Sequence, residues 1–323
     1  MKNSSINSVT RNPGLEFQQD IFSKIRINRS AVEKRCSEYS TRRSIKKQNQ
    51  AAWLMKVISL IDLTTLSGDD TEARVRRLCR KAINPINEKL VEDLSIESLG
   101  LSTAAVCVYH DMLAAAKKVL EGHNIKLAAV STGFPAGLSP LPLRLEEIKY
   151  SVKAGADEID IVISRRLVLE GKWNKLYDEV KSFRNACGKA HLKTIIATGD
   201  LGNLNNIAKA SQVCMMAGAD FIKTSTGKEP TNATLPVSLV MTRMIRDYYE
   251  RTGYRVGFKP AGGVSVSKTA LQYMIMIEEE LGRRWLEADL LRFGASSLLA
   301  DIERQLDHFS SGYYSTYYRH PLA

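Results

Sequence analysis

A lysine at the end of a short apolar run is the first residue in this sequence whose position suggests chemistry. Lys223, in the stretch ADFIKTSTGKEP (219–230), follows a run typical of a buried strand and precedes a turn of hydroxyl residues. Lysine is almost never fully buried unless another group pairs with it. Lys259 ends the run YRVGFK (254–259) in the same way. Each ammonium group therefore needs a partner or a function.

Two lysines close together could perform amine chemistry on a carbonyl compound. An attacking lysine must be neutral, so its pKa has to fall from about 10.4 to roughly 7–8. Burial and a neighbouring cation are the usual means. If their strands are neighbours, about 4.8 Å apart, then Lys259 is a suitable cation for Lys223. From these residues alone, the two lysines could also exchange roles.

Such chemistry also moves protons, and Asp160 in the stretch DEIDIVIS is the candidate carrier. If Ile159 and Ile161 face outward, strand alternation turns Asp160 inward. A buried carboxylate is costly unless it is paired, and the two lysines would pair it. The alternative is that Asp160 forms only a structural salt bridge. We expect Asp157 and Glu158 to be ordinary solvent-side charges at the start of the strand.

The elements that must position these side chains alternate between short β-rich runs and longer amphipathic stretches. The predicted strands span 57–62, 103–109, 126–131, 158–164, 192–197, 220–225, 254–259 and 290–294. Strands that alternate with helices indicate a parallel sheet, and eight such units in about 250 residues favour a closed (β/α)8 TIM barrel. Active sites of this fold lie at the carboxyl ends of the strands, where Lys223 and Lys259 are expected.

Asp62 and Thr64 end the first predicted strand at the same rim. There they could bind substrate hydroxyl groups. Alternatively, Asp62 holds a loop while Asp69, Asp70 and Thr71 cap the next helix. The sequence does not decide between these two readings.

The loops after the seventh and eighth strands have the composition of a phosphate site. Their residues are Gly262 and Gly263 in KPAGGVS and Ser296 and Ser297 in GASSLL. Glycines permit close backbone approach, and a helix N-terminus supplies N–H groups. Gly227 closes the turn after the sixth strand, and Lys228 either reaches the same anion or stays solvated. Together these loops predict a phosphorylated substrate.

Composition and motifs exclude several other classes of protein. Of 323 residues, 44% are hydrophobic and 25% charged, within the globular norm. No apolar run approaches the roughly 20 residues of a membrane span, and five cysteines without a C-x-x-C pair predict a reduced, cytoplasmic protein. With five scattered histidines and no Walker or G-x-G-x-x-G loop, we expect neither a metal nor a nucleotide cofactor.

The positive charge is concentrated near the start of the chain. Residues 1–50 contain eleven Lys and Arg and four Asp and Glu, +7 of the total +11. Residues 1–15 have the composition of a disordered segment, and 30–56 the pattern of helix. We interpret 1–50 as an N-terminal helical extension with a solvated basic face, although a nucleic-acid-binding or organelle-targeting arm is the alternative. The barrel is expected over 51–310 and a Tyr-rich tail over 311–323; the oligomeric state stays open, with a homo-oligomer compatible.

Several motifs in the same order resemble one enzyme family. The stretches IDLTTL, DEIDIVI, DFIKTSTGK, VGFKPAGGV and FGASSLL are similar to those of 2-deoxyribose-5-phosphate aldolases, particularly the animal form, over about residues 50–310. The resemblance implies a class I aldolase that cleaves 2-deoxy-D-ribose 5-phosphate to D-glyceraldehyde 3-phosphate and acetaldehyde. It also implies that Lys223 forms the Schiff base, that Lys259 tunes it and moves protons, and that Asp160 is the acid/base partner.

The sequence departs from the family pattern at two positions. Ser265 stands where family members often have arginine, and His110 where proline is usual. Bacterial members also use a C-terminal tyrosine near the site; the candidates here are Tyr313, Tyr314, Tyr317 and Tyr318. The alternatives are a Schiff-base barrel aldolase for another sugar phosphate, or a basic-arm nucleic-acid-binding protein on an inactive barrel.

Overall fold

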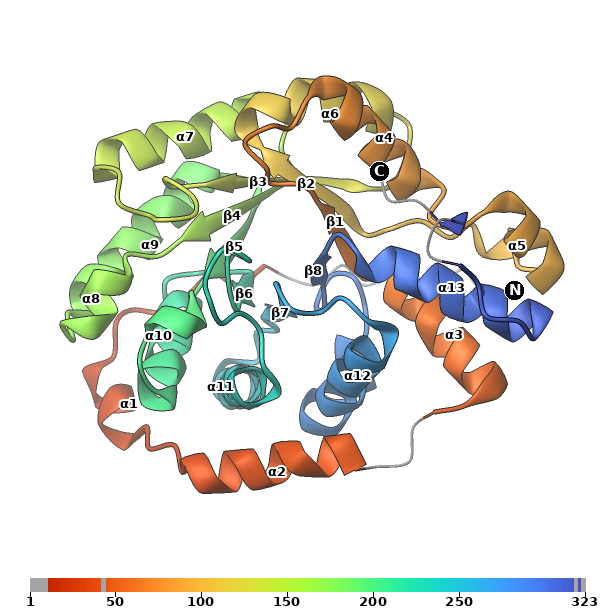
Figure 1. Cartoon of the computed structure of the whole chain (residues 1–323). Coiled ribbons are helices and arrows are strands. Elements are labelled where there is room, and N and C mark those ends of the chain that lie inside the picture. The colour runs from red at the N-terminus through yellow and green to blue at the C-terminus, as the bar shows by residue number, and fades with distance from the viewer. Residues whose placement is uncertain (1–10, 42–44, 317–318, 321–323) are drawn as a thin grey trace, which may run out of the picture.

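Eight parallel strands form a closed barrel with helices around its outside (Figure 1). The computed structural model describes residues 11–41, 45–316 and 319–320. The strands are β1 (Ile61–Thr64), β2 (Ala105–Tyr109), β3 (Lys126–Ser131), β4 (Glu158–Val162), β5 (His191–Ile195), β6 (Phe221–Lys223), β7 (Gly257–Lys259) and β8 (Phe293–Ala295). Each strand from β1 to β6 pairs with the next, and β1 pairs with β8. Isolated bridges from Phe258 to Leu291 and from Ala261 to Gly294 join the segments of β7 and β8 and close the ring. The predicted (β/α)8 barrel is confirmed.

The α-helices occupy the connections and both terminal segments. They are α1 (Gln19–Lys24), α2 (Arg29–Thr41), α3 (Lys47–Ile58), α4 (Glu72–Ile83), α5 (Glu88–Leu94), α6 (Leu113–Leu120), α7 (Leu141–Lys153), α8 (Arg165–Leu169), α9 (Trp173–Cys187), α10 (Leu204–Met216), α11 (Leu235–Thr252), α12 (Ser267–Leu281) and α13 (Leu298–Ser311). Short 3-10 turns span Glu97–Leu99, His110–Met112, Thr198–Asp200 and Arg283–Trp285. Among the described helices, none is long and apolar enough to cross a membrane.

The first strand begins later than the sequence predicts. The run 57–62 was expected to be a strand, but Val57 and Ile58 are the buried last turn of α3, and β1 starts at Ile61. A short apolar run has no periodicity that separates a buried helix turn from a buried strand. The shift matters for the site, because it places Thr64 at the last position of β1.

The loop after β1 is fixed by the polar residues that the sequence marks as helix-capping. Thr71 is the N-cap of α4, and its side chain accepts a hydrogen bond from the Arg74 N–H. Asp70 accepts hydrogen bonds from the Thr65 hydroxyl and the Ser67 N–H. Thr71 therefore caps the helix, as one of the two alternatives states, while Asp70 holds the loop that precedes the helix.

The two faces of each strand have different surroundings. On β4, Ile159 and Ile161 point outward into the apolar layer between strands and helices, whereas Asp160 points into the barrel and contacts lysines from other strands. The alternation expected from the sequence is confirmed here. The outer layer supplies the large hydrophobic core, so the barrel interior is free to contain charged groups.

The start of the described chain is anchored to the barrel. We expected residues 1–15 to be disordered, and residues 1–10 lie outside the described part. Asn12, however, is buried: its amide donates to the carbonyls of Met215 and Ala219 at 2.8 and 3.0 Å, and Tyr248 donates to its oxygen. The prediction of disorder is therefore wrong for residues 11–15, because one asparagine binds two carbonyls, one in the last turn of α10 and one just after that helix.

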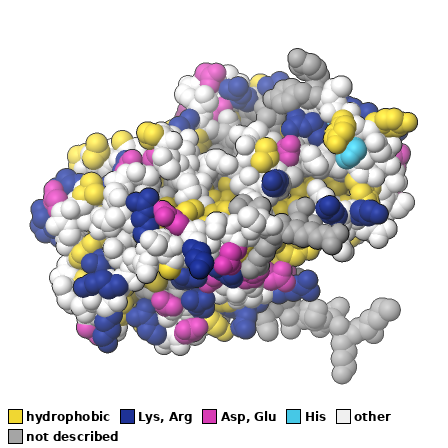
Figure 2. Space-filling model, turned by 60° about the horizontal axis from the view of Figure 1, so that its bottom comes forward, with side chains coloured by type: hydrophobic (Ala, Val, Ile, Leu, Met, Phe, Trp, Pro, Cys, Tyr) yellow, Lys and Arg dark blue, Asp and Glu magenta, His cyan; other side chains and the backbone are white. Residues whose placement is uncertain are grey.

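Helix α2 covers the outside of α11 and α12 (Figure 1). Val32 and Cys36 are buried there, and Arg35 forms an ion pair of 2.7 Å with Glu279. Figure 2 shows that, among the described residues, Lys and Arg are interspersed with Asp and Glu over this face. The described part of the basic arm thus includes helix α2 packed on the barrel, which agrees with the predicted N-terminal helical extension.

Candidate active site

The two lysines at the strand ends lie side by side and share one carboxylate. Lys223 and Lys259 are register partners at the last positions of β6 and β7. Their Nζ atoms lie 2.8 and 2.7 Å from the same Oδ2 of Asp160. Lys259 also contacts Asp62 at 2.6 Å. The tertiary structure therefore brings together the three residues that the sequence selects for carbonyl chemistry.

Two further cations extend this cluster deeper into the barrel. Lys193 of β5 lies 2.9 Å from Asp62, 2.5 Å from Glu158 and 3.3 Å from Asp160. Arg292 lies 2.6 Å from Asp62 and 2.8 Å from Glu158. We call the seven residues the charge network: Asp62, Glu158, Asp160, Lys193, Lys223, Lys259 and Arg292. Their side chains are at most 3% exposed.

Sequence reasoning missed part of this network. Glu158 was expected at the solvent, but it is only 2% exposed. The prediction was wrong because Glu158 is two positions before Asp160, and alternate residues of a strand share a face. Lys193 and Arg292 were not selected, although each is a cation within an apolar run, LKTIIA and LLRFG. That is the same signal that identified Lys223.

The charge network shifts the pKa values of Lys223 and Lys259 in opposite directions. Burial lowers the pKa of Lys223; the Asp160 carboxylate opposes this shift and the charge of Lys259 adds to it, with a lowered pKa as the result. Burial would also lower the pKa of Lys259, but Asp160 and Asp62 outweigh it and raise that pKa. Burial alone would raise the pKa of Asp160, yet the surrounding lysines hold it below its usual value. Lys223 is therefore the lysine more readily neutral.

An aromatic ring lies beneath the network. The ring of Phe221 on β6 has Lys193 and Arg292 over it, at 5.9 and 5.8 Å from its centre. It fits because Gly257 on the next strand lacks a Cβ, which would approach the ring atoms to 2.3–2.5 Å. Cations gain from the negative face of a ring, most of all where water is absent.

Two other glycines are required by close approach. A Cβ on Gly294 would lie 3.2 Å from Lys259 Cε and 2.9 Å from the Cβ of Ala261. Gly262 has a φ of +71°, and a Cβ there would lie 2.6 Å from the side chain of Asn232. Gly294 therefore leaves space for the stem of Lys259, and Gly262 lets two loops meet at the rim.

A cavity of about 300 Å³ opens above the network at the carboxyl ends of the strands. We call it the mouth cavity. It is lined by Thr64, Leu66, Lys223, Thr226, Gly227, Lys228, Ala261, Gly262, Gly263, Val264, Ser265, Gly294, Ala295, Ser296 and Ser297. Within that described lining, Lys223 is the single member of the charge network. The rim positions that the sequence selects, including Thr64 and Ser297, thus surround Lys223.

Asp62 occupies a different place from its neighbour Thr64. Its carboxylate is fully buried and contacts Lys193, Lys259 and Arg292, and it is absent from the lining of the mouth cavity. Thr64 lines the cavity and donates its hydroxyl to the Asp62 carbonyl at 2.7 Å. This geometry makes Asp62 part of the charge network and leaves Thr64 at the rim.

The loop after β6 is held in one conformation at the cavity edge. The Glu229 carboxylate accepts hydrogen bonds from the N–H of Thr226, at 3.0 and 3.1 Å, and from its hydroxyl at 2.7 Å. The Lys228 N–H in turn donates to the Thr226 hydroxyl oxygen. Gly227, with a φ of +86°, makes the turn between them. The ordered turn keeps the exposed Lys228 beside the cavity.

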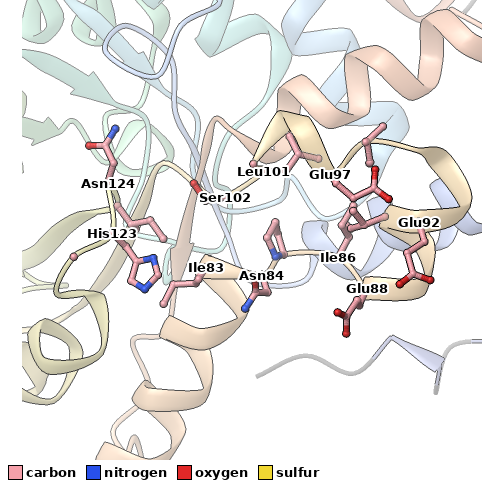
Figure 3. Close-up of a pocket in the computed structure, with 16 residues that line it drawn as sticks. Ile83, Asn84, Ile86, Glu88, Glu92, Glu97, Leu101, Ser102, His123 and Asn124 are labelled. Carbon is pink, nitrogen blue, oxygen red and sulfur yellow. The ribbon is translucent and has the colours of Figure 1, made fainter.

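A larger groove, of about 780 Å³, lies at the other end of the barrel, before β2 and β3 (Figure 3). Its lining includes the carboxylates of Glu88, Glu92 and Glu97, with His123 at the far side. We call it the acidic groove. Carboxylates repel an anion such as phosphate, so its size alone does not make it the site for a sugar phosphate.

Comparison with known proteins identifies the family. The model of the DeoC/LacD family aldolases matches residues 56–304. The chain belongs to the DeoC/LacD aldolase family. It is 54% identical to a deoxyribose-phosphate aldolase of Mus musculus over 312 residues, covering 96% of this chain and 98% of that one. It is 53% identical to the Homo sapiens protein of the same name, over 97% and 99% of the two chains. As a member of an aldolase family, the protein is a lyase.

The solved structures agree on the fold of this DeoC/LacD aldolase. A tetrameric deoxyribose phosphate aldolase from Aeropyrum pernix superposes with a TM-score of 0.57 at 24% identity, covering 82% of this chain and 97% of that one. At this identity the likeness concerns the fold alone. It is consistent with the closed barrel described above.

The positions that depart from the family pattern lie outside the charge network. Ser265 is exposed on the wall of the mouth cavity, and His110 begins a 3-10 turn after β2. Tyr313 and Tyr314 are 80% and 89% exposed. They follow the C-terminal end of α13, whereas the N-terminal end of that helix is the one at the cavity. Tyr317 and Tyr318 are outside the described residues.

Within the described chain, no group of three or more His, Cys, Asp or Glu could hold a metal ion.

Proposed function

We propose that this aldolase cleaves 2-deoxy-D-ribose 5-phosphate to D-glyceraldehyde 3-phosphate and acetaldehyde through an imine on Lys223. The observation that carries the proposal is that Lys223 joins a buried cluster of charges to a cavity with loops suited to phosphate. The mammalian relatives at 53–54% identity are deoxyribose-phosphate aldolases, which supports this choice of substrate.

The first half of the reaction uses the neutral amine of Lys223. It attacks the aldehyde carbon C1 of the open-chain sugar and forms a carbinolamine, which loses water to give a protonated imine. Lys259 and Asp160 share an oxygen-to-nitrogen contact of 2.7 Å beside this amine. The same Asp160 oxygen lies 2.8 Å from the Lys223 nitrogen. Both contacts are within the 2.6–3.2 Å range for proton transfer, so the pair can supply and remove the protons of both steps.

The second half breaks the bond between C2 and C3. Removal of the C3 hydroxyl proton forms the aldehyde of glyceraldehyde 3-phosphate, and the electron pair of the broken bond moves into the imine to give an enamine. Protonation of C2 restores an imine, and water releases acetaldehyde and regenerates Lys223. The water lost in the first half is regained here, so the overall reaction is a cleavage without net hydrolysis.

The phosphate is proposed to bind at Gly262, Gly263, Ser296 and Ser297. Ser297 is the N-cap of the 14-residue helix α13, and the first N–H groups of a helix have no intrahelical partner. Gly263 has a φ of +81°, a conformation that suits glycine and exposes backbone N–H groups. Lys228, exposed on the adjacent loop, adds a positive charge on the same side.

Reductive trapping tests the proposal directly. The protein is incubated with 2-deoxyribose 5-phosphate and sodium borohydride, digested, and mapped by mass spectrometry. We expect irreversible loss of activity and a modified peptide at Lys223. A modification found on Lys259 instead would contradict the assignment of the imine. Activity that disappears in EDTA and returns with zinc would contradict the amine mechanism as a whole.

A further inference from the structure

The charge network contains one more positive group than negative groups. Its cations are Lys193, Lys223, Lys259 and Arg292, and its carboxylates are Asp62, Glu158 and Asp160. With every group ionised the interior would hold a net charge of +1. An unpaired charge in a dry interior is costly, so the network favours the state in which one lysine is neutral.

The contacts show where the excess charge falls. Among the described residues, Lys193 forms ion pairs with all three carboxylates, and Lys259 and Arg292 with two each. Lys223 forms its ion pair with Asp160 alone. The cation with the fewest carboxylate partners gives up its proton at the lowest cost, and it is also the lysine that lines the mouth cavity.

We propose that Arg292 and Glu158 are positioning residues that set the neutral fraction of Lys223 through the net charge of the network. Neither forms an ion pair with Lys223 or Asp160 in the described structure. Arg292 acts through Asp62, and Glu158 acts through Lys193, which contacts Asp160 at 3.3 Å. The inference rests on the proposed amine chemistry of Lys223 and extends it to residues at the base of the barrel.

Other titratable groups beside the network do not alter this count near neutral pH. Cys107, on the inner face of β2, is buried and its pKa is raised by burial, so it stays a neutral thiol. His191 at the start of β5 faces Glu158 and Asp220, but burial is the largest influence and lowers its pKa, which keeps it neutral. The balance is therefore decided by the seven network residues.

Two substitutions should move the acidic limb of the pH profile of kcat/KM in opposite directions. In Arg292→Met, three cations face three carboxylates, so protonated Lys223 is balanced and the acidic limb of kcat/KM should move to higher pH. In Glu158→Gln, the excess rises to +2, so Lys223 loses its proton more readily and the limb should move to lower pH. We expect shifts of about half a unit to one unit, smaller than those from directly contacting charges.

Two charge-matched variants serve as controls. Arg292→Lys retains the cation, and its limb should stay at the parent position even if its melting temperature falls. The double variant Arg292→Met/Glu158→Gln has three cations and two carboxylates, the same excess of +1 as the parent. Its limb should return to the parent position. If Arg292 and Glu158 served folding alone, these variants would lose activity, but the direction in which the acidic limb moves would not depend on whether a cation or a carboxylate was removed.

The measurement does not depend on turnover. The pH dependence of Lys223 labelling by formaldehyde and cyanoborohydride, mapped by mass, reports the neutral amine even if 2-deoxyribose 5-phosphate is not cleaved. Labelling limbs that move oppositely would support the inference, while limbs unmoved or moved in one direction by both single variants would overturn it. Should Arg292→Met not fold, Lys193→Met also removes one cation, and an unmoved limb in that variant would equally count against the proposal.

Discussion

The mouth cavity and the acidic groove lie at opposite ends of the same barrel. The groove is the larger, at about 780 Å³ against 300 Å³, and it is lined by Glu88, Glu92 and Glu97. The cavity is lined by small residues and by two lysines, Lys223 and Lys228. The difference teaches that volume does not mark the site in this protein. What distinguishes the mouth cavity, our proposed site, is an amine, Lys223, in contact with buried charges.

The chain direction explains this difference. Parallel strands bring all their carboxyl ends to one rim, so inward residues near those ends converge on the same space. Lys223, Lys259 and Asp160 come from three strands, and both lysine nitrogens lie within 2.8 Å of the Asp160 carboxylate. The acidic groove is formed by the connections that precede β2 and β3, and its carboxylates are exposed.

The largest expected effect comes from removing the amine of the mouth cavity. Lys223→Met should lower kcat for 2-deoxyribose 5-phosphate by several orders of magnitude, because no imine can form. Steady-state kinetics and borohydride trapping measure the loss, and circular dichroism checks the fold. Retention of more than about a tenth of the parent activity would show that the chemistry does not depend on this lysine.

A smaller effect is expected from the neighbouring cation. In Lys259→Leu, the repulsion that lowers the Lys223 pKa is removed, so that pKa should rise and the acidic limb of kcat/KM should move to higher pH by about one to two units. Activity at pH 7 should fall by more than this shift explains, since a proton carrier is also lost. Raising the pH should restore only the first part. An acidic limb at the same pH as in the parent would show that Lys259 does not tune the Lys223 pKa and serves only in proton transfer.

Adding one carboxylate to each hollow compares the two regions directly. Ser296→Asp places a negative charge where the phosphate is proposed to bind, so KM for 2-deoxyribose 5-phosphate should rise by about 10- to 100-fold. Unphosphorylated deoxyribose should be affected little. Ser102→Asp, on the wall of the acidic groove, is the matched control and should leave both KM values unchanged. Equal loss with the two substrates in Ser296→Asp would place the phosphate elsewhere.

The smallest effect is expected in the acidic groove itself. Glu92 is exposed on α5, and Glu92→Gln should change the free energy of unfolding by no more than about 0.5 kcal/mol. Its kcat and KM should equal those of the parent. Urea unfolding and steady-state kinetics test both statements. A tenfold change in KM would mean that the groove takes part in binding the substrate, and the contrast between the two ends would fail.

The sequence identifies the lysines and the aspartate because strand residues alternate in direction. Lys223, Lys259 and Asp160 each interrupt or end an apolar run, a pattern that a polar interior explains. The same rule applied to Glu158 would have turned it inward as well. The sequence places Glu158 first in its strand, a position that usually faces solvent. It does not show that Lys193 and Arg292, from other parts of the chain, cover this position.

The sequence by itself determined the alternation of strands and helices, hence the barrel and the rim where Lys223 lies, because periodicity and chain direction are local properties. Only the tertiary structure decided the depth and the charge balance of the interior. Lys193 and Arg292 come from strand regions 99 residues apart in number, yet both contact Asp62 and Glu158. The pKa of a buried amine depends on every charge within a few ångströms, and those distances exist only once the barrel has closed.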